Sequence, residues 1–451
     1  MICEFISRSE SKRLIMLFAG WAMDGNIFDG LSHDGYDMLA VWDYNDECLE
    51  ADLSGYDEIC ILAWSYGVYF AGRFIEKNKS LPFTAKVAVN GTMCPIDSTY
   101  GITPEIFNAT IAALSPNSLL KFYRRMCGGA ERYCQIAQKL QNRPFESVKS
   151  ELENIRNTYV ADGMPEADWD YAFVSRNDLI YPPQAQLAFW RNKTEIIEIE
   201  SHHYPDFKSI VSRAFILKGG VAEAFSRSAD TYEENAQAQY VVAQTLADKI
   251  AGCGRLRGTV WEIGPGSGFL SRRIAEDSGI SELTLIDVSP ISDNLPGEHV
   301  IADAETMIIN QASESVDAIV SSSAVQWFNS LKTFFCQAHR VLAPGGLLAV
   351  AVYGNRTFNE LEGLVSPSRV FATTALKHYV EPLFDILDIE ETAINQKFNS
   401  PMEVLRHFRL TGVAPAATSM ESVAVAKQVV RNNVTTLTYN PIFLLLTKKK
   451  L

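Results

Sequence analysis

Apolar and polar positions along the chain fall into two series in which strand-like and helix-like segments alternate. In the first 215 residues, short apolar runs predict strands, and the stretches between them have the spacing of amphipathic helices. The predicted strands cover residues 13–18, 38–42, 58–64, 86–89, 171–174 and 195–199. Strands that alternate with helices predict an α/β domain with a mostly parallel sheet.

A second α/β series follows Lys218, Gly219 and Gly220. Its predicted strands cover residues 259–263, 283–287, 318–321, 347–352 and 436–446. We place a linker at the glycine pair, because glycine favours flexible connections. The sequence thus predicts one domain over residues 1–217 and another over residues 218–451. Helical spacing with almost no strand signal over about 104–165 predicts a helical cap on the first domain.

The composition is that of packed globular domains rather than of a membrane or disordered protein. The 451 residues are 47% hydrophobic and 21% charged. The apolar runs at 14–21 and 442–446 are far shorter than the roughly 20 residues that span a bilayer. The stretch 14–23 lacks the cleavage pattern of a signal peptide. These features predict a cytoplasmic protein without a membrane partner.

Charge and cysteine content narrow the class of function further. A net charge of −14 makes nucleic acid an improbable partner. The eight cysteines form no C-x-x-C pair and are scattered along the chain, which predicts reduced structural thiols and no metal site.

A candidate nucleophile lies between a predicted strand and a predicted helix in the first half. Ser65 occupies Ala-Trp-Ser-Tyr-Gly at 63–67, and small residues at 63 and 67 allow a tight turn. Such a turn raises a serine above the sheet of an α/β-hydrolase and directs the next backbone N–H at a developing oxyanion. We therefore assign the oxyanion donors to the backbones of Tyr66 and of Trp21, which follows the first predicted strand.

The order of the triad in this fold, serine then acid then histidine, limits the partners of Ser65. His33 precedes the serine, so His202 and His203 are the candidates for the base, and we favour His203 on motif resemblance. Asp178 follows a strand and is the preferred acid, ahead of Asp97 and Asp162. Its role would be to orient the imidazole and stabilise the imidazolium.

Several stretches of the first half are similar to one enzyme family. They cover residues 18–24, 64–68, 89–92, 95–97 and 203–205. The half resembles the pimeloyl-[acyl-carrier-protein] methyl ester esterases of biotin synthesis, in the divergent group with a reduced α/β-hydrolase fold. The resemblance implies that Ser65 forms a pimeloyl-enzyme intermediate and that the substrate is carried on acyl carrier protein.

Basic residues gather in the predicted cap of this acidic chain. Between 121 and 149 there are seven bases against the two acids Glu131 and Glu146, and a basic cap would attract an acidic carrier protein. A solvated helix face is the alternative interpretation. The bases are Lys121, Arg124, Arg125, Arg132, Lys139, Arg143 and Lys149, of which Lys121, Arg124, Arg125 and Arg132 are candidates for substrate binding.

The second half has its own glycine-rich turn after a predicted strand. Glu262 ends the strand at 259–263, and Gly264, Gly266 and Gly268 let the backbone approach a ligand closely. The spacing acidic-x-G-x-G-x-G resembles S-adenosylmethionine-dependent methyltransferases more than dinucleotide dehydrogenases. The resemblance leaves Glu262 to meet the cationic amino group of the cofactor.

Acidic residues follow the next two strands in the order that such a methyltransferase uses. Asp287 would bind both ribose hydroxyls, and Asp303, beside Ala304, would contact the adenine amine. These residues together predict a Rossmann-like class I methyltransferase with S-adenosylmethionine as cofactor.

The second half also resembles one subfamily, the malonyl-[acyl-carrier-protein] O-methyltransferases. The stretches that carry the resemblance are 224–229, Tyr232, 325–328, 357–361, 407–408 and 411–412. A malonyl carboxylate is already ionised at neutral pH, so methylation needs alignment and desolvation but no general base. Tyr232, Gln326 and Trp327 are candidates to line the acceptor pocket, and Arg227 is a candidate to hold the carboxylate.

The two resemblances together predict a bifunctional enzyme of biotin synthesis. The second half would mask a carboxylate as a methyl ester before chain elongation, and the first half would remove the ester afterwards. One alternative is that one half is inactive and serves as a carrier-binding or regulatory module. Another is a general esterase fused to a small-molecule methyltransferase.

Overall fold

The computed structural model describes residues 1–140, 142–216, 218–361, 370–411 and 419–449. It divides into two compact units, Met1–Phe215 and Ile216–Leu451. The sequence places this division two residues later and assigns Gly219 and Gly220 to a linker. That assignment is wrong, because both glycines lie in the first turn of helix α8 (Lys218–Asn235). Glycine costs about 1 kcal/mol relative to alanine inside a helix, a penalty that an 18-residue helix tolerates.

The first unit contains a seven-stranded sheet in the order β1-β3-β2-β4-β5-β6-β7. All neighbouring strands are parallel except β1, which pairs antiparallel with β3 at one edge. The strands are β1 (Ile2–Ser7), β2 (Arg13–Phe18), β3 (Asp37–Trp42), β4 (Glu58–Trp64), β5 (Phe83–Val89), β6 (Tyr171–Ser175) and β7 (Glu195–Ile199). Strand β1 is absent from the sequence prediction, because it lies at the edge and its side chains are only half-buried or exposed.

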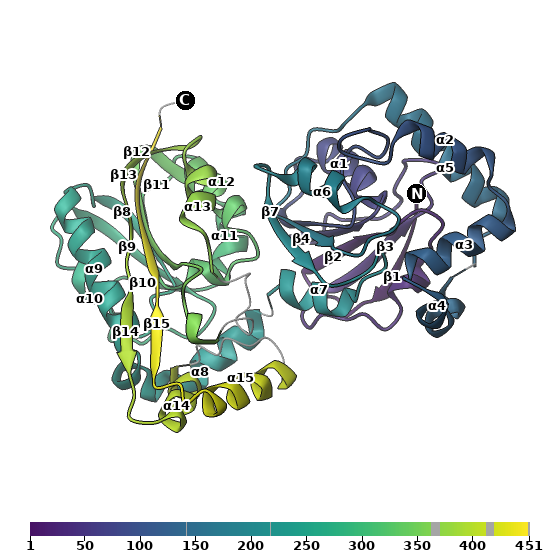
Figure 1. Ribbon diagram of the computed structural model, residues 1–451. Helices are drawn as coiled ribbons and strands as arrows, with labels where there is room; N and C mark the ends of the chain where they lie inside the picture. Colours follow the sequence, from purple (N-terminus) through teal and green to yellow (C-terminus); the bar gives the residue numbers. More distant parts are fainter. Residues whose placement is uncertain (141, 217, 362–369, 412–418, 450–451) are drawn as a thin grey trace. The chain divides into compact units, whose positions relative to one another are not determined.

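Helices join the parallel strands of the first unit and supply the layers beside its sheet. They are α1 (Gly67–Lys77), α2 (Pro104–Ala112), α3 (Pro116–Met126), α4 (Ala130–Ile136), α5 (Phe145–Asp162), α6 (Pro183–Trp190) and α7 (Phe207–Ala214). Helices α2 to α5 occupy the segment in which the sequence predicts a cap, and Figure 1 shows them gathered beside the sheet. Strands β2 and β4 are buried along almost their whole length, which explains their continuous apolar runs.

The second unit contains another seven-stranded sheet, in the order β10-β9-β8-β11-β12-β16-β13. Strands β8 to β12 are parallel, and β16 runs antiparallel between β12 and β13. The strands are β8 (Gly258–Ile263), β9 (Ile280–Asp287), β10 (Glu298–Ile301), β11 (Val316–Ser322), β12 (Leu342–Tyr353), β13 (Phe384–Glu391) and β16 (Pro441–Lys448). A small hairpin of β14 (Ile394–Lys397) and β15 (Thr436–Tyr439) lies outside this sheet.

Alternate residues of the central strands face two separate hydrophobic cores. Ala318 and Val320 of β11 pack with α9 (Gln237–Cys253), while Ile319 packs with α12 (Leu331–Val341) on the opposite face. Figure 1 shows α9 and α12 on opposite sides of the sheet. The second unit is therefore a three-layer α/β structure. Its remaining helices are α10 (Ser271–Ile274), α11 (Ala304–Asn310), α13 (Thr373–Val380), α14 (Pro401–Thr411) and α15 (Ser419–Arg431).

One strand prediction in the second half is corrected by the structure, and the edge strand β13 is absent from the prediction. The run 436–446 is divided between β15 and β16, because Asn440 separates the hairpin from the sheet. Strand β13 has no sequence prediction, since its many acidic side chains are exposed at the edge of the sheet. Edge strands lack the continuous apolar pattern that marks buried ones.

Candidate functional sites

Ser65 lies in a strained turn between β4 and α1. Its φ angle of 59° is in the left-handed region, which costs free energy for a residue with a side chain. The neighbouring Gly67 is required here, because a Cβ atom would lie 2.6 Å from the carbonyl oxygens of Phe18 and Ala19. The Ser65 N–H donates to the carbonyl of Val89 on β5, which fixes the turn over the end of the sheet.

His203 joins Ser65 to Asp178 through two hydrogen bonds. Its Nε2 lies 3.0 Å from Ser65 Oγ, and its Nδ1 lies 2.8 Å from Asp178 Oδ2. All three side chains are buried. Asp178 Oδ1 accepts hydrogen bonds from the backbone N–H groups of Ile180 and Tyr181, which orient the carboxylate. The arrangement can move a proton from the serine hydroxyl to the imidazole.

The alternative residues considered from the sequence lie elsewhere. The His202 ring bonds to the carbonyl of Asn177 and not to Ser65. Asp97 accepts hydrogen bonds from backbone N–H groups of its own loop, at Thr99 and Tyr100. Asp162 forms an ion pair with Arg73. Among the described residues, none of these three side chains forms a hydrogen bond with the His203 ring.

The loop that carries His203 is held by side chains from two strands. Trp64 Nε1 and Asn90 Nδ2 both donate to the His203 carbonyl oxygen, at 2.8 and 2.9 Å. Tyr204, the next residue, donates its N–H to the carbonyl of Met126 in α3. His203 is therefore fixed from the sheet on one side and from the cap helices on the other.

The loop after β2 presents the second predicted oxyanion donor. In the described part of the chain, neither the Trp21 nor the Tyr66 backbone N–H donates a hydrogen bond. The side chain of Trp21 is fixed by a hydrogen bond of 2.8 Å from its Nε1 to the Val148 carbonyl. Both N–H groups are thus available to a ligand oxygen, as the sequence prediction requires.

A buried ion pair attaches the cap to this loop. Glu151 of α5 accepts hydrogen bonds from the backbone N–H groups of Ala22 and Tyr44, at 3.1 and 3.0 Å. Arg143 forms an ion pair with Glu151 at 2.7 Å and donates to the Met23 carbonyl. Burial raises the pKa of Glu151, although the Arg143 charge opposes the shift. The predicted surface cation Arg143 is thus a buried structural residue.

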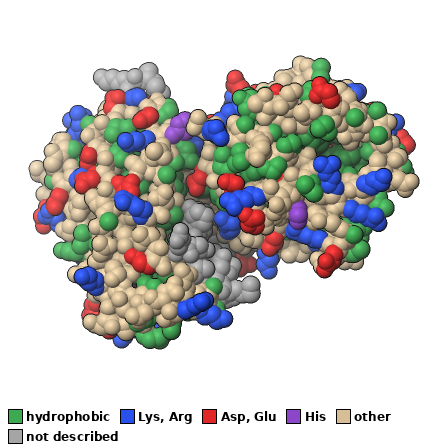
Figure 2. Space-filling model, in the orientation of Figure 1, with side chains coloured by type: hydrophobic (Ala, Val, Ile, Leu, Met, Phe, Trp, Pro, Cys, Tyr) green, Lys and Arg blue, Asp and Glu red, His purple; other side chains and the backbone are tan. Residues whose placement is uncertain are grey.

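The other bases of the cap have different surroundings. Lys121, Arg124 and Arg125 of α3 are exposed, and Figure 2 shows Lys and Arg side chains gathered over the region where Figure 1 places α3. Arg132 lies over the Tyr204 ring, 5.7 Å from its centre, and is half-buried. The described surface of the cap therefore carries a basic face. Arg132, which follows this face in the sequence, contacts Tyr204 in the loop that carries His203.

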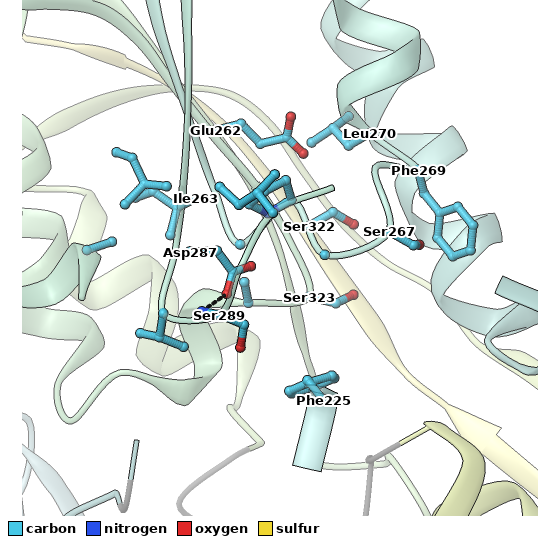
Figure 3. A pocket seen from close by; sticks show the side chains of 18 of the residues that line it. Phe225, Glu262, Ile263, Ser267, Phe269, Leu270, Asp287, Ser289, Ser322 and Ser323 are labelled. Carbon is cyan, nitrogen blue, oxygen red and sulfur yellow. Dashed lines mark hydrogen bonds between the residues drawn. The ribbon is translucent and has the colours of Figure 1, made fainter. Parts of the chain in front are cut away.

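The glycine-rich turn after β8 opens into a cavity of about 660 Å³ in the second unit. Gly264 has a φ angle of 69°, and a Cβ atom there would lie 2.2 Å from the Ala324 Cβ. Gly266 also lines the cavity, with φ of 53°. Gly268 does not line it. Figure 3 shows the Glu262, Asp287, Ser323 and Phe225 side chains around this space.

Two buried carboxyl groups face the cavity from β8 and β9. Glu262 is 1% exposed, and within the described residues its Oε2 has no hydrogen-bond partner. Burial raises the pKa of Glu262 to about 8. Burial also raises the pKa of Asp287, while a hydrogen bond from the Ser289 N–H at 2.9 Å opposes the shift. Asp303 and Ala304 line the cavity at the start of α11, where Asp303 caps the helix.

The predicted acceptor residues do not all reach the cavity. Tyr232 and Trp327 line it, and Phe225 contacts both rings. Gln326 does not line it; its amide donates to the carbonyl of Ser323. The side chain of Arg227 lies outside the described residues.

Sequence reasoning missed Gln239, a glutamine of α9 that does line the cavity. The signal is present, because Gln239 lies on the buried stripe formed by Ala238, Val242, Ala243 and Leu246. A polar residue on the apolar face of a helix needs a partner. Glu151 is a second buried polar residue of this kind, on α5.

No helix among the described residues has the length and hydrophobicity needed to cross a bilayer. Over the same ranges, no group of three or more His, Cys, Asp or Glu side chains is arranged to hold a metal ion.

Comparison with known proteins defines the class of each unit. Residues 261–350 match the family described as a methyltransferase domain. The strand order of the second unit and its glycine turn are those of the Rossmann-like class I fold. Residues 1–211 match the family described as pimeloyl-ACP methyl esterase BioG. The chain thus joins a BioG-type α/β unit to a class I methyltransferase domain.

Relatives of the chain identify its family. A malonyl-[acyl-carrier protein] O-methyltransferase of Bacteroides fragilis is 31% identical over 426 residues, which cover 89% of this chain and 84% of the relative. The chain belongs to the family of that protein. An uncharacterized protein of Haemophilus influenzae is 36% identical over 43% of this chain and 90% of its own length. The crystal structure of BioG from Haemophilus influenzae is 33% identical, covers 46% of this chain and 94% of its own, and has a TM-score of 0.43.

S-adenosylmethionine is the cofactor of the second unit, as the sequence predicts. The residues at the cavity fit it. Glu262 presents an unpaired buried carboxylate oxygen that can meet the cationic amino group. Asp287 ends β9 beside the cavity, where a carboxylate can accept hydrogen bonds from ribose hydroxyls.

Proposed function

We propose that the chain is a bifunctional enzyme of biotin synthesis that forms and removes a carboxyl methyl ester on acyl carrier protein. The second unit methylates the free carboxylate of the malonyl carrier. The first unit is an α/β-hydrolase with a helical cap, and it hydrolyses the methyl ester of the pimeloyl carrier. The names of the relatives support the two substrates, and a further relative is a biotin biosynthesis bifunctional protein of Bordetella avium, 34% identical over 154 residues.

The contacts of His203 with Ser65 and Asp178 are the observation that supports serine catalysis in the first unit. His203 Nε2 takes the proton of Ser65 as Oγ attacks the ester carbonyl. The backbone N–H groups of Trp21 and Tyr66 stabilise the negative charge that develops on the carbonyl oxygen.

Collapse of this intermediate expels methoxide, which leaves as methanol with the proton from His203. The pimeloyl group then forms an ester with Ser65. A water molecule attacks that ester, gives a proton to His203 and releases the free acid, while the proton returns to Ser65. Throughout, Asp178 stays ionised and holds the imidazole.

The second unit needs no general base. A malonyl carboxylate is ionised near neutral pH, and S-adenosylmethionine supplies an electrophilic methyl group when it is bound. Glu262, Asp287 and Asp303 would hold the cofactor from three successive strand ends. Phe225, which contacts Tyr232 and Trp327, narrows the cavity and excludes water from the acceptor.

The carrier would dock through the basic face of α3. Lys121, Arg124 and Arg125 are exposed there, on a chain whose net charge is −14. A local positive surface on an acidic protein attracts an acidic partner and orients it. Arg132, above Tyr204, would lie between this face and the catalytic loop.

The two reactions are complementary in purpose. A methyl ester hides a carboxylate whose burial would cost several kcal/mol in the enzymes that elongate the chain. Hydrolysis restores the acid when elongation is complete. We also infer a cytoplasmic location, because all eight cysteines are free thiols.

Two mass measurements test the proposed function. The full chain is incubated with malonyl carrier and S-adenosylmethionine, and separately with the methyl ester of pimeloyl carrier. The proposal expects the first carrier to gain a methyl group and the second to lose one. An unchanged malonyl carrier would contradict the first activity and an unchanged pimeloyl ester the second. Activity only on simple esters or small acids would favour a general esterase fused to a small-molecule methyltransferase.

A further inference from the structure

The Gln239 side chain is buried and unsatisfied at the wall of the methyltransferase cavity. It is 4% exposed, and neither Oε1 nor Nε2 has a hydrogen-bond partner among the described residues. Leaving a buried amide without partners costs free energy, so such a group in a cavity wall points to a ligand that satisfies it. Gln239 lines the same cavity as Glu262 and Asp287.

One polar neighbour of this amide already has a hydrogen-bond partner. Tyr439, whose buried hydroxyl interacts with Gln239, shares a hydrogen bond of 2.5 Å with His407. The Tyr439 hydroxyl is thus held by His407, and neither atom of the Gln239 amide meets it in hydrogen-bond geometry, so the amide can bind an occupant of the cavity.

We propose that the Gln239 side-chain amide binds the carboxylate of the methyl acceptor. This inference rests on the proposed function of the second unit. The Nε2 group would donate a hydrogen bond to one carboxylate oxygen and leave the other for methylation. Sequence reasoning gives this role to Arg227, whose side chain lies outside the described residues. It places Gln326 in the acceptor pocket, but Gln326 does not line the cavity.

The charges around the cavity favour a neutral donor in this role. Arg272 is the one cation among the described residues that line it, and its side chain pairs with Glu233 at an exposed position. An amide can orient a carboxylate without forming an ion pair, so the oxygen keeps more of its nucleophilic charge. Aromatic walls at Phe225, Tyr232 and Trp327 lower the local dielectric and strengthen the hydrogen bond.

Gln239 lies on a different element from the groups assigned to the cofactor. Glu262 and Asp287 belong to β8 and β9, whereas Gln239 belongs to α9, directly after the helix that carries Phe225 and Tyr232. Figure 3 shows Phe225 at the end of the cavity away from Glu262. We therefore assign the acceptor side to helices α8 and α9 and the cofactor side to the strand ends.

Substitution of Gln239 with two different side chains tests the inference. Gln239→Leu removes the donor, and Gln239→Glu keeps the size while adding a negative charge. A hydrogen bond to a charged group is worth enough to raise the KM for malonyl carrier about ten-fold or more in Gln239→Leu. The Glu variant should raise it further by repulsion. The Kd of S-adenosylhomocysteine, measured by calorimetry, should change less than about two-fold and also shows that the variants fold.

Gln237→Leu is the matched control, because Gln237 begins the same helix and is exposed. It should keep the wild-type KM. Wild-type KM in both Gln239 variants would overturn the inference. A weaker Kd for S-adenosylhomocysteine with an unchanged KM for the carrier would also overturn it, by assigning the amide to the cofactor. If the wild-type protein does not methylate malonyl carrier at all, the proposed function fails, and this inference fails with it.

Discussion

The indole of Trp64 donates a hydrogen bond of 2.8 Å to the backbone carbonyl of His203. The residue immediately before the proposed nucleophile thus holds the loop that carries the proposed base. Both groups are buried, and the two rings are 5.3 Å apart. This contact connects residues 139 positions apart in the chain and holds the His203 loop next to the turn that carries Ser65.

Trp64→Phe should therefore impair ester hydrolysis without preventing folding. The phenyl ring keeps most of the packing, but the His203 carbonyl loses one of its two side-chain donors and retains Asn90. We expect kcat for the pimeloyl ester to fall about ten-fold, the effect of roughly 1.4 kcal/mol in positioning. Trp169→Phe is the control, since its indole bonds to Met93 in another part of the core. Equal kcat in the two variants would contradict this role for Trp64.

Asp178→Asn should nearly abolish hydrolysis through the tautomer of His203. The Oδ1 atom is held by the N–H groups of Ile180 and Tyr181, so the new amide nitrogen would face His203 Nδ1. That nitrogen would donate to Nδ1 and leave the imidazole proton on Nε2, which then cannot accept the proton of Ser65. The expected loss in kcat is about 10⁴-fold.

Steady-state rates and the circular dichroism spectrum check the prediction for Asp178. Asp206→Asn is the control, because Asp206 caps α7 at an exposed site and asparagine caps helices equally well. A decrease of less than about ten-fold in Asp178→Asn would mean that the acid does not fix the tautomer.

Glu151→Gln should destabilise the first unit and slow hydrolysis together. The substitution removes one of the two carboxylates that pair with the buried Arg143 side chain and leaves only Asp43, which costs about 2 kcal/mol in the free energy of unfolding. It also weakens the hydrogen bond to the backbone N–H of Ala22, the residue that follows the proposed oxyanion donor Trp21. Urea unfolding and kcat are the measurements. Glu153→Gln on the same helix should change neither, and unchanged stability in Glu151→Gln would contradict the structural role of the pair.

Cofactor binding should become tighter as the pH rises toward about 8. Burial raises the pKa of Glu262 to about 8, so this carboxyl is mostly protonated at neutral pH in the free protein. A cationic amino group favours the ionised form, so binding releases a proton and the affinity increases with pH. In Glu262→Gln the affinity should be lower and lose this pH dependence.

Calorimetric titration with S-adenosylhomocysteine in buffers of different ionisation enthalpy measures the proton release directly. The release should be present in the wild type at neutral pH and absent in Glu262→Gln. Equal proton release in both proteins would show that the released proton comes from a group other than Glu262.

Residues close in sequence to a strand end could be predicted because local structure positions them. The turn at Ser65 and the glycine turn after Glu262 each combine a buried strand, small residues and a following helix. The prediction of a methyltransferase domain with S-adenosylmethionine is confirmed by the family match. Chain order reduced the proposed base to His202 or His203, but only the three-dimensional contacts of the rings distinguish these neighbours, because the His203 ring meets Ser65 and Asp178 while the His202 ring meets Asn177.

Residues that act through distant contacts could not be predicted from local pattern. Glu151 reaches the Ala22 N–H across 129 positions, and nothing near Glu151 in the sequence indicates that contact. Gln239 has a local signal on its helix, yet its function depends on a cavity built mainly by the strand ends of β8 and β9. Arg143 resembles its exposed neighbours in sequence and differs only in its buried partner.

The central claim is that one chain both forms and removes a carboxyl methyl ester, with hydrolysis at Ser65. The most direct measurement is the mass of both carrier substrates after incubation with Ser65→Ala. Ser150→Ala, an exposed serine of α5, is the matched control and should retain both activities. The account predicts that Ser65→Ala still methylates malonyl carrier and leaves pimeloyl carrier methyl ester intact. Normal hydrolysis of that ester by Ser65→Ala would contradict it.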